Sequence, residues 1–255
     1  MLEVKGLSKH FGGVVAVSEY HLTVDKKEIL GLIGPNGAGK TTVFNLLSGN
    51  IKPSKGEIIF DGKEITNYSS AQTAKVGLAR TFQNIKLFGE LSVLENIKVG
   101  LHMRNGSSFF HTLLHTPRFT KSEKKITCKA IELAQLMGIE PILHHQASDL
   151  PYGEQRKMEI ARALATNPKI LMLDEPAAGM NPQETNSLMN TIKKIFEDFG
   201  ITILIVEHDI KFIMNLCSRI QVLDQGRLIE EGTPQQVKNS KKVIEAYLGT
   251  PKKDK

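Results

Sequence analysis

The feature that most constrains this chain is a glycine-rich stretch near its start. The stretch reads Gly34, Pro35, Asn36, Gly37, Ala38, Gly39, Lys40 and Thr41, and it matches the pattern G-x-x-x-x-G-K-[ST] at every fixed position. The apolar run 29–33 precedes it, and a helical pattern over 41–47, closed by Gly49, follows it. Because the pattern binds phosphate in this strand, loop and helix context, it predicts a phosphate-binding loop rather than a chance glycine-rich turn.

The physical chemistry of this loop favours a polyphosphate. Small residues let successive backbone N–H groups point inward, and the start of the next helix adds partial positive charge. Lys40 brings a point charge to the β- and γ-phosphates, and the Thr41 hydroxyl can ligate Mg²⁺.

Length and composition indicate an ordinary soluble protein. The chain has 255 residues, a net charge of +6 and 40% hydrophobic residues, which allows one large domain or two intimate ones. The N-terminus has no apolar signal region, and no run approaches the ~18 apolar residues of a spanning helix. Cys128 and Cys217 lie far apart, which indicates a reducing compartment. We therefore expect a cytoplasmic protein.

Apolar runs alternating with helical spacing predict an α/β fold. Unbroken runs at 170–173, 201–206 and 220–223, with a helical pattern at 185–199, indicate parallel strands covered on both faces. Shorter runs predict antiparallel strands at 2–4, 14–17, 22–24 and 57–61. Residues 71–165 are predicted to be mostly helical, apart from a loop-like stretch at 103–121 that is either a partner contact or a connector.

Acidic residues follow one of these predicted parallel strands. Asp174 and Glu175 close the run 170–173, and the carboxyl edge of a parallel sheet is where such sheets bind ligands. One carboxylate can orient Mg²⁺, and the next can poise a water for in-line attack. The alternative is that Glu175 only caps the turn at Pro176. His208 follows the next strand in the same way, where it can donate to a γ-phosphate or be structural.

Two further segments suggest a composite site. Gln83 lies between the first half of the predicted nucleotide site and the helical middle, where its amide can contact a metal-bound water. Gly153 and the helix start after it offer backbone donors to an anion. Because the chain already has a phosphate loop, this second set of donors predicts contact with the γ-phosphate held by another copy.

Together these segments resemble the ATP-binding subunit of ABC transporters over nearly the whole chain. The segments that carry the resemblance are the phosphate loop (34–41), Gln83, the signature segment (150–155), the run 170–175, the segment 178–181 and His208. The resemblance implies ATP and Mg²⁺ as cofactors and ATP hydrolysis coupled to transport. It implies a catalytic set of Glu175 as general base, His208 as γ-phosphate sensor, Lys40 and Gln83. The implied metal ligands are Thr41, Gln83 and Asp174. The implied nucleotide-binding residues are Phe11, Val17, Gly34, Pro35, Asn36, Gly37, Ala38, Gly39, Lys40, Thr41 and Thr42, with Gly153 and Gln155 acting on the partner's nucleotide.

The resemblance also implies the fold and its divisions. The expected fold is an α/β P-loop NTPase (RecA-like) core with an antiparallel β-subdomain and an inserted α-helical subdomain. The whole chain, 1–255, is expected to be one ABC ATP-binding domain. Its core and β-subdomain would take 1–82 and 166–235, its helical and signature subdomain 83–165, and its C-terminal extension 236–255.

Departures from the usual family pattern indicate a subfamily. Pro151 and Tyr152 stand where the signature Leu-Ser-Gly-Gly-Gln has serine and glycine, and Asn181 stands where an aspartate is usual. These residues, the insertion near 103–121 and the chain ending look like the LivG-type ATPase of branched-chain amino acid importers. The alternative is the ATPase of lipopolysaccharide export, which shares much of this pattern but lacks the insertion.

The resemblance implies specific partners. These are a second ATP-binding subunit, the same or a related chain, membrane permease subunits and, indirectly, a periplasmic or extracellular solute-binding protein, at the cytoplasmic face of the inner membrane. Residues 85–99, with Leu87, Phe88, Leu91 and Leu94, are expected to support a permease helix unless they are ordinary core.

Two other functional classes fit the sequence less well. A soluble ABC-type ATPase acting on ribosomes or DNA usually carries two cassettes or long coiled insertions, so we expect no nucleic-acid partner. A P-loop kinase or GTPase would leave the signature segment unexplained, and a guanine-reading Asn-Lys-x-Asp segment is absent.

Overall fold

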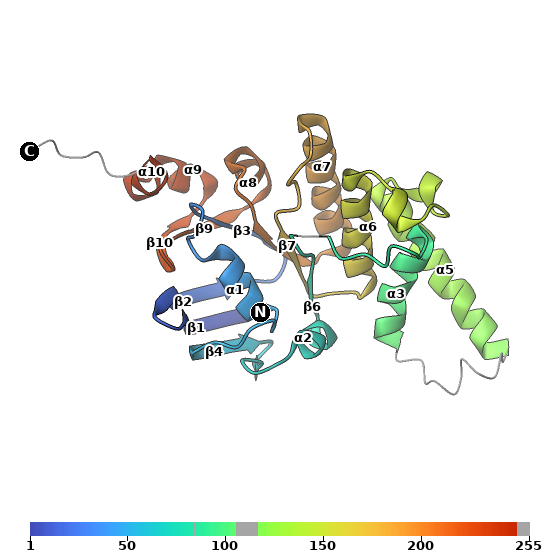
Figure 1. Cartoon of the computed structure of the whole chain (residues 1–255), viewed down its shortest axis with the longest axis horizontal. Helices are drawn as coiled ribbons and strands as arrows, with labels where there is room; N and C mark the ends of the chain where they lie inside the picture. The colour runs from blue at the N-terminus through green and yellow to red at the C-terminus, as the bar shows by residue number, and fades with distance from the viewer. Residues whose placement is uncertain (84, 106–116, 249–255) are drawn as a thin grey trace, which may run out of the picture.

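Two β-sheets and a set of helices make up the computed structural model, which describes residues 1–83, 85–105 and 117–248 (Figure 1). The larger sheet has six strands in the order β10-β9-β3-β8-β7-β6, and only its edge pair β10 and β9 is antiparallel. The smaller sheet is antiparallel, with the order β2-β1-β4-β5. This arrangement confirms the expected α/β core with an antiparallel β-subdomain.

The strands agree with most of the predicted runs. The larger sheet contains β3 (Ile29–Ile33), β6 (Leu78–Arg80), β7 (Ile170–Asp174), β8 (Thr202–Val206), β9 (Arg219–Asp224) and β10 (Arg227–Gly232). The smaller sheet contains β1 (Leu2–Phe11), β2 (Val14–Val24), β4 (Lys55–Phe60) and β5 (Lys63–Glu64). The predicted runs 14–17 and 22–24 are parts of one strand, β2. The prediction of helix around 78–80 was wrong, because β6 pairs with the buried strand β7.

Helices pack against the larger sheet, and α3, α5 and α6 also pack against one another beside it (Figure 1). The helices are α1 (Lys40–Leu47), α2 (Ser70–Val76), α3 (Val93–Asn105), α5 (Pro117–Met137), α6 (Tyr152–Ala165), α7 (Pro182–Phe199), α8 (Ile210–Leu216), α9 (Pro234–Asn239) and α10 (Lys241–Leu248). Two 3₁₀ turns, η1 (Glu140–Ile142) and η2 (Ala147–Asp149), precede α6.

The loop expected at 103–121 was predicted too long at both ends. Helix α3 continues to Asn105, and α5 begins at Pro117, a residue well suited to the first helical position. Residues 106–116, which include the rest of that prediction, lie outside the described residues.

Both faces of the larger sheet are buried. In β7, Leu171 and Leu173 face one apolar cluster, while Ile170 and Met172 face the other. The first cluster includes residues of α6, α7 and α8, and the second joins the sheet to α1 and the smaller sheet. In Figure 1, α1 lies on the side of β1, β2 and β4, and α7 and α8 lie on the opposite side. Burial on both faces explains why the parallel strands are unbroken apolar runs.

The carboxyl ends of three parallel strands are level with one another. Val206 of β8 pairs with Leu32 of β3 on one side and with Asp174 of β7 on the other. The phosphate loop, the residues after Asp174 and the residues after Val206 therefore emerge at the same edge of the sheet.

We expect two glycine substitutions to separate backbone strain from steric clash in the smaller sheet. Gly56 and Gly62 both have left-handed backbones, with φ of +93° and +78°. A Cβ on Gly56 would lie 2.5 Å from the carbonyl oxygen of Gly6, whereas nothing lies within 4 Å of a Cβ on Gly62. Gly62→Ala should cost about 1–2 kcal/mol. Gly56→Ala should cost at least about 2 kcal/mol more, since the strand must shift. Urea unfolding measures both, and equal costs would contradict the close packing of β4 on β1.

Candidate nucleotide site

The phosphate loop is held by close backbone packing on both sides. Gly34 and Gly39 have φ of +153° and +101°. A Cβ on Gly34 would lie 2.1 Å from the carbonyl oxygen of Leu223 in β9, and one on Gly39 would lie 2.6 Å from that of Ala16 in β2. Glycine is therefore required at both positions by space as well as by backbone conformation.

Lys40 is folded back over the loop that precedes it. Its side chain is buried, and its Nζ donates to the carbonyl oxygens of Gly34 at 2.7 Å and Pro35 at 3.0 Å. Burial lowers the pKa of Lys40, and the charges of Glu175 and Asp174 oppose that shift. The structure therefore brings the ammonium group and both acidic residues to one place, as the sequence predicted.

Asp174 is buried at the end of β7 in an ion pair that the sequence did not reveal. Its Oδ2 lies 2.6 Å from Nη2 of Arg80, while its Oδ1 has no hydrogen-bond partner among the described residues. Arg80 also donates to the side chains of Asn45 and Ser48. No local signal marked Arg80, because it ends the short strand β6 in a stretch with a helical pattern.

Glu175 and Gln83 are in direct contact. The Gln83 Nε2 donates to Glu175 Oε2 at 2.9 Å, although the two residues are 92 positions apart in the chain. Glu175 has a φ of +46°, and its backbone N–H donates to the carbonyl oxygen of Val206 at 2.9 Å. A non-glycine residue in the left-handed region is strained, and such strain is concentrated at functional sites.

His208 lies at the end of β8, and the residue before it proves to be structurally important. The His208 side chain is 60% exposed, with its Nδ1 3.7 Å from the Oε2 of Glu207. Glu207 is buried and accepts hydrogen bonds from the backbone N–H groups of Ala177 and His208. Burial raises the pKa of Glu207, against the effect of these bonds. Glu207 thus ties the end of β8 to the turn after Glu175.

The other residues expected around the nucleotide differ in exposure. Phe11 is half exposed at the end of β1, with the Nζ of Lys9 5.1 Å from its ring centroid. Val17 is fully buried behind the loop, where its side chain would lie 3.5 Å from a Cβ on Gly39. Thr41 is exposed and Thr42 half-buried in the first turn of α1. Contact of these four residues with a nucleotide stays a prediction.

The signature segment begins α6. Pro151 occupies the N-cap position, and the Gln155 side chain donates to the carbonyl oxygen of Leu150 at 2.9 Å. A Cβ on Gly153 would lie 3.6 Å from Oε1 of Glu184 in α7. Contact of Gly153 and Gln155 with the nucleotide of a partner stays a prediction.

Comparison with known proteins decides the family. The family model described as ABC transporter matches residues 17–178, which is more than half of the chain. The chain belongs to this family. A second model, described as branched-chain amino acid ATP-binding cassette transporter, matches residues 227–253 of the cassette.

Individual relatives cover nearly the whole cassette. The high-affinity branched-chain amino acid transport ATP-binding protein LivG of Escherichia coli (strain K12) is 44% identical over 249 residues, 98% of each chain. Among solved structures, the ADP conformation of the ATP-binding cassette MJ1267 has a TM-score of 0.84 and 32% identity, covering 98% of both chains. The dimeric post-hydrolysis state of the cassette MJ0796, bound to ADP and Pi, has a TM-score of 0.78 and 26% identity, covering 92% of this chain and 99% of that one.

These findings confirm the expected fold and activity. The protein is an ATP-binding and ATP-hydrolysing cassette of the ABC type. Within the described ranges, none of its helices is both long and apolar enough to span a membrane.

Four charged residues near the site were missed by the sequence analysis: Arg80, Arg156, Glu159 and Glu207. Arg156 and Glu159 are fully or almost fully buried in α6 and form an ion pair. Their spacing of three residues was a possible signal for the pair. Nothing in the sequence indicated that the Arg156–Glu159 ion pair is buried.

Lys40→Ala should remove most ATP binding, because the loop would lose the charge nearest to the β- and γ-phosphates. Affinity for ATP should fall by at least about tenfold, measured by isothermal titration calorimetry or fluorescent-nucleotide displacement. Lys194→Ala, which removes an exposed lysine of α7, is the matched control and should bind like the wild type. Unchanged affinity in Lys40→Ala would refute the assignment of the phosphate loop.

Proposed function

We propose that this cassette powers an importer of branched-chain amino acids, acting with a second cassette, the same or a related chain. The observation that carries the catalytic part is the hydrogen bond between Gln83 and Glu175. The charges of Glu175 and of the buried Asp174 also act on the ammonium group of Lys40. The substrate is supported by the LivG relative and by the C-terminal match over 227–253. Both favour the amino acid importer over the lipopolysaccharide-export alternative.

Each residue at the sheet edge has a distinct role in this proposal. Glu175 accepts the proton of the attacking water, and Gln83 holds the Glu175 carboxylate in place. Lys40 leaves the loop carbonyls that it contacts and neutralises the β- and γ-phosphates. His208, which is largely exposed, donates to the γ-phosphate.

The residues present fit a magnesium ion. The buried Oδ1 of Asp174 lacks a partner among the described residues, and a buried carboxylate oxygen without a partner is costly. With the exposed hydroxyl of Thr41 and the amide oxygen of Gln83, it forms a set of hard oxygen donors of the kind that Mg²⁺ prefers. When bound, the ion supplies charge neutralisation of the phosphates. Thr41, Gln83 and Asp174 are therefore the proposed ligands, directly or through water.

The proposal includes a dimer with nucleotide between the copies. The relative MJ0796 forms a dimer bound to ADP and Pi. In this chain Gly153 lies at the start of α6 beside α7, whereas the phosphate loop is packed between β2 and β9. The backbone donors at Gly153 then complete the site of the partner, and each copy is incomplete alone.

Glu175→Gln should bind ATP but hydrolyse it poorly, because the amide cannot accept the proton of the attacking water. We expect turnover to fall by at least about 100-fold, in line with the loss of a general base. ATP should then hold the variant as a dimer on gel filtration. Glu197→Gln, an exposed substitution in α7, is the control and should behave like the wild type. Wild-type turnover in Glu175→Gln would show that another base acts.

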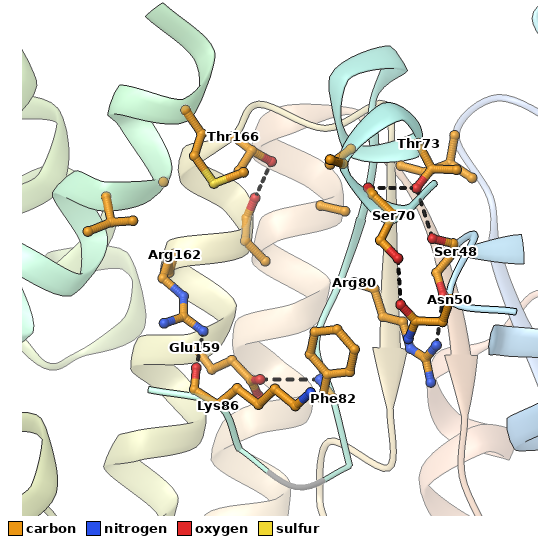
Figure 2. A pocket seen from close by; sticks show the side chains of 18 of the residues that line it. Ser48, Asn50, Ser70, Thr73, Arg80, Phe82, Lys86, Glu159, Arg162 and Thr166 are labelled. Atoms are coloured by element: carbon orange, nitrogen blue, oxygen red, sulfur yellow. Dashed lines mark hydrogen bonds between the residues drawn. The ribbon is translucent and has the colours of Figure 1, made fainter. Parts of the chain in front are cut away.

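An apolar groove lies next to this site. Figure 2 shows it between α2 on one side and α3 and α6 on the other, with Phe82 and Arg80 at its end. It encloses about 420 Å³. Its apolar lining includes Leu87, Val99 and the exposed side chains of Phe88 and Met103.

We infer that a segment of the permease seats in this groove. Of the expected contact surface at 85–99, Leu87 and Leu94 pack against the core, whereas Phe88 is 50% exposed. The guanidinium of Arg162 lies 5.5 Å from the Phe88 ring centroid, which holds the ring in place. A partner seated here would touch Arg80, which is bonded to Asp174. Such docking would hold the cassette at the cytoplasmic face of the membrane as a peripheral subunit.

Phe88→Ala should impair transport more than it impairs ATP hydrolysis. The substitution removes an exposed ring from the groove and leaves the sheet edge untouched. Leucine uptake by the reconstituted transporter should fall by about tenfold, while ATPase activity of the isolated subunit should change by less than about twofold. Leu248→Ala, which removes an exposed apolar side chain from α10, is the control. Equal losses of uptake and ATPase would assign Phe88 to the core.

A further inference from the structure

A buried arginine in α6 holds the backbone of the segment that carries Gln83. Arg156 is fully buried. Its Nη1 donates to the carbonyl oxygen of Phe82 at 2.6 Å, and its Nη2 donates to that of Gln83 at 2.9 Å. The planar guanidinium thus binds two successive carbonyl groups with its two ends, a geometry that lysine cannot reproduce.

Glu159, one turn further along α6, binds both Arg156 and the same backbone segment. Its Oε2 lies 2.7 Å from Nη1 of Arg156, and its Oε1 accepts from the backbone N–H of Phe82 at 3.2 Å. Burial raises the pKa of Glu159, and the charge of Arg156 opposes that shift. A buried ion pair is by itself weak evidence for a stabilising role. Arg156 binds the carbonyl oxygens of Phe82 and Gln83, and Glu159 binds the backbone N–H of Phe82, so the pair holds this segment through both kinds of backbone group.

Tyr152, a residue of the signature segment, contacts both Arg156 and the turn after Glu175. Its hydroxyl accepts from Nη2 of Arg156 at 3.0 Å, and the Arg156 guanidinium lies 5.7 Å from its ring centroid. A Cβ on Gly179, in the turn after Glu175, would lie 3.5 Å from Cε1 of Tyr152. This tyrosine stands where the usual family signature has glycine, so the contact depends on a residue at which this chain departs from that pattern.

We propose that Arg156 is a positioning residue that makes the Gln83–Glu175 contact depend on the seating of the signature segment. Tyr152 of the signature segment accepts a hydrogen bond from Arg156, Arg156 holds the backbone of Gln83, and the Gln83 side chain lies 2.9 Å from Glu175. A shift of α6 would move the held carbonyls and break this contact. The inference rests on the proposed function of Glu175 as general base.

A double-mutant cycle on ATP hydrolysis tests this. Arg156→Lys keeps the charge facing Glu159 but loses the two-ended grip. We expect kcat to fall by about tenfold while KM for ATP stays within about twofold. If Arg156 acts through Gln83, the same substitution in a Gln83→Ala background should change kcat by less than about twofold.

Two further variants keep the test decisive. Tyr152→Phe removes one hydroxyl from a side chain that is 41% exposed, so it should fold even if Arg156→Lys does not. Tyr152→Phe should lower kcat by about threefold in the wild-type background and leave kcat nearly unchanged in the Gln83→Ala background. Arg219→Lys is the matched control, because Arg219 binds Glu28, Glu231 and the carbonyl oxygen of Thr23. It should leave kcat unchanged.

The outcomes separate this inference from the proposed function. Equal falls in kcat with and without Gln83 would overturn the positioning role, as would an unchanged kcat in both Arg156→Lys and Tyr152→Phe. Wild-type turnover in Glu175→Gln would instead contradict the proposed general base.

Discussion

The level pairing of three buried parallel strands is the constraint on which the rest of this molecule depends. Val206 sits between Leu32 and Asp174 in the ladder, so the strands β3, β8 and β7 end together. The phosphate loop, the acidic pair and the segment of His208 therefore emerge at one edge. A shift of register by one residue would exchange the two buried faces of a strand and also displace its functional end. The core and the nucleotide site are thus fixed by the same backbone hydrogen bonds.

Buried charge at this edge is tolerated because nearly every charged group has a partner. Asp174 is paired with Arg80, Glu207 accepts two backbone N–H groups, and Lys40 donates to two loop carbonyls. An isolated charge would be far more costly in such surroundings. Among the described residues, Oδ1 of Asp174 is the one buried carboxylate oxygen without a hydrogen-bond partner, and the proposed cation would supply the missing contact. The pairing of Asp174 with Arg80 also connects the end of β7 to the apolar groove, because Arg80 lines that groove.

Helix α6 connects the functions of the cassette. Its first residues form the signature segment, its buried Arg156 holds the backbone of Gln83, and its Arg162 lies over the Phe88 ring in the groove. Under the proposed function, a displacement of this one helix would move the donors offered to a partner's nucleotide, the segment that contacts Glu175 and one wall of the groove.

The sequence by itself determined the phosphate loop, the parallel strands, the acids at the strand ends and the family, because each is written in consecutive residues with a recognisable spacing. Tertiary structure decided the rest. Arg80 and Asp174 are 94 positions apart, Gln83 and Glu175 are 92 apart, and β6 is a strand only because β7 offers it an edge. Arg156 is a charged residue in a helical stretch, and nothing local indicates that it is fully buried. A charged side chain can be buried only where remote segments supply its partners, and a local sequence pattern does not show which remote segments will lie beside it.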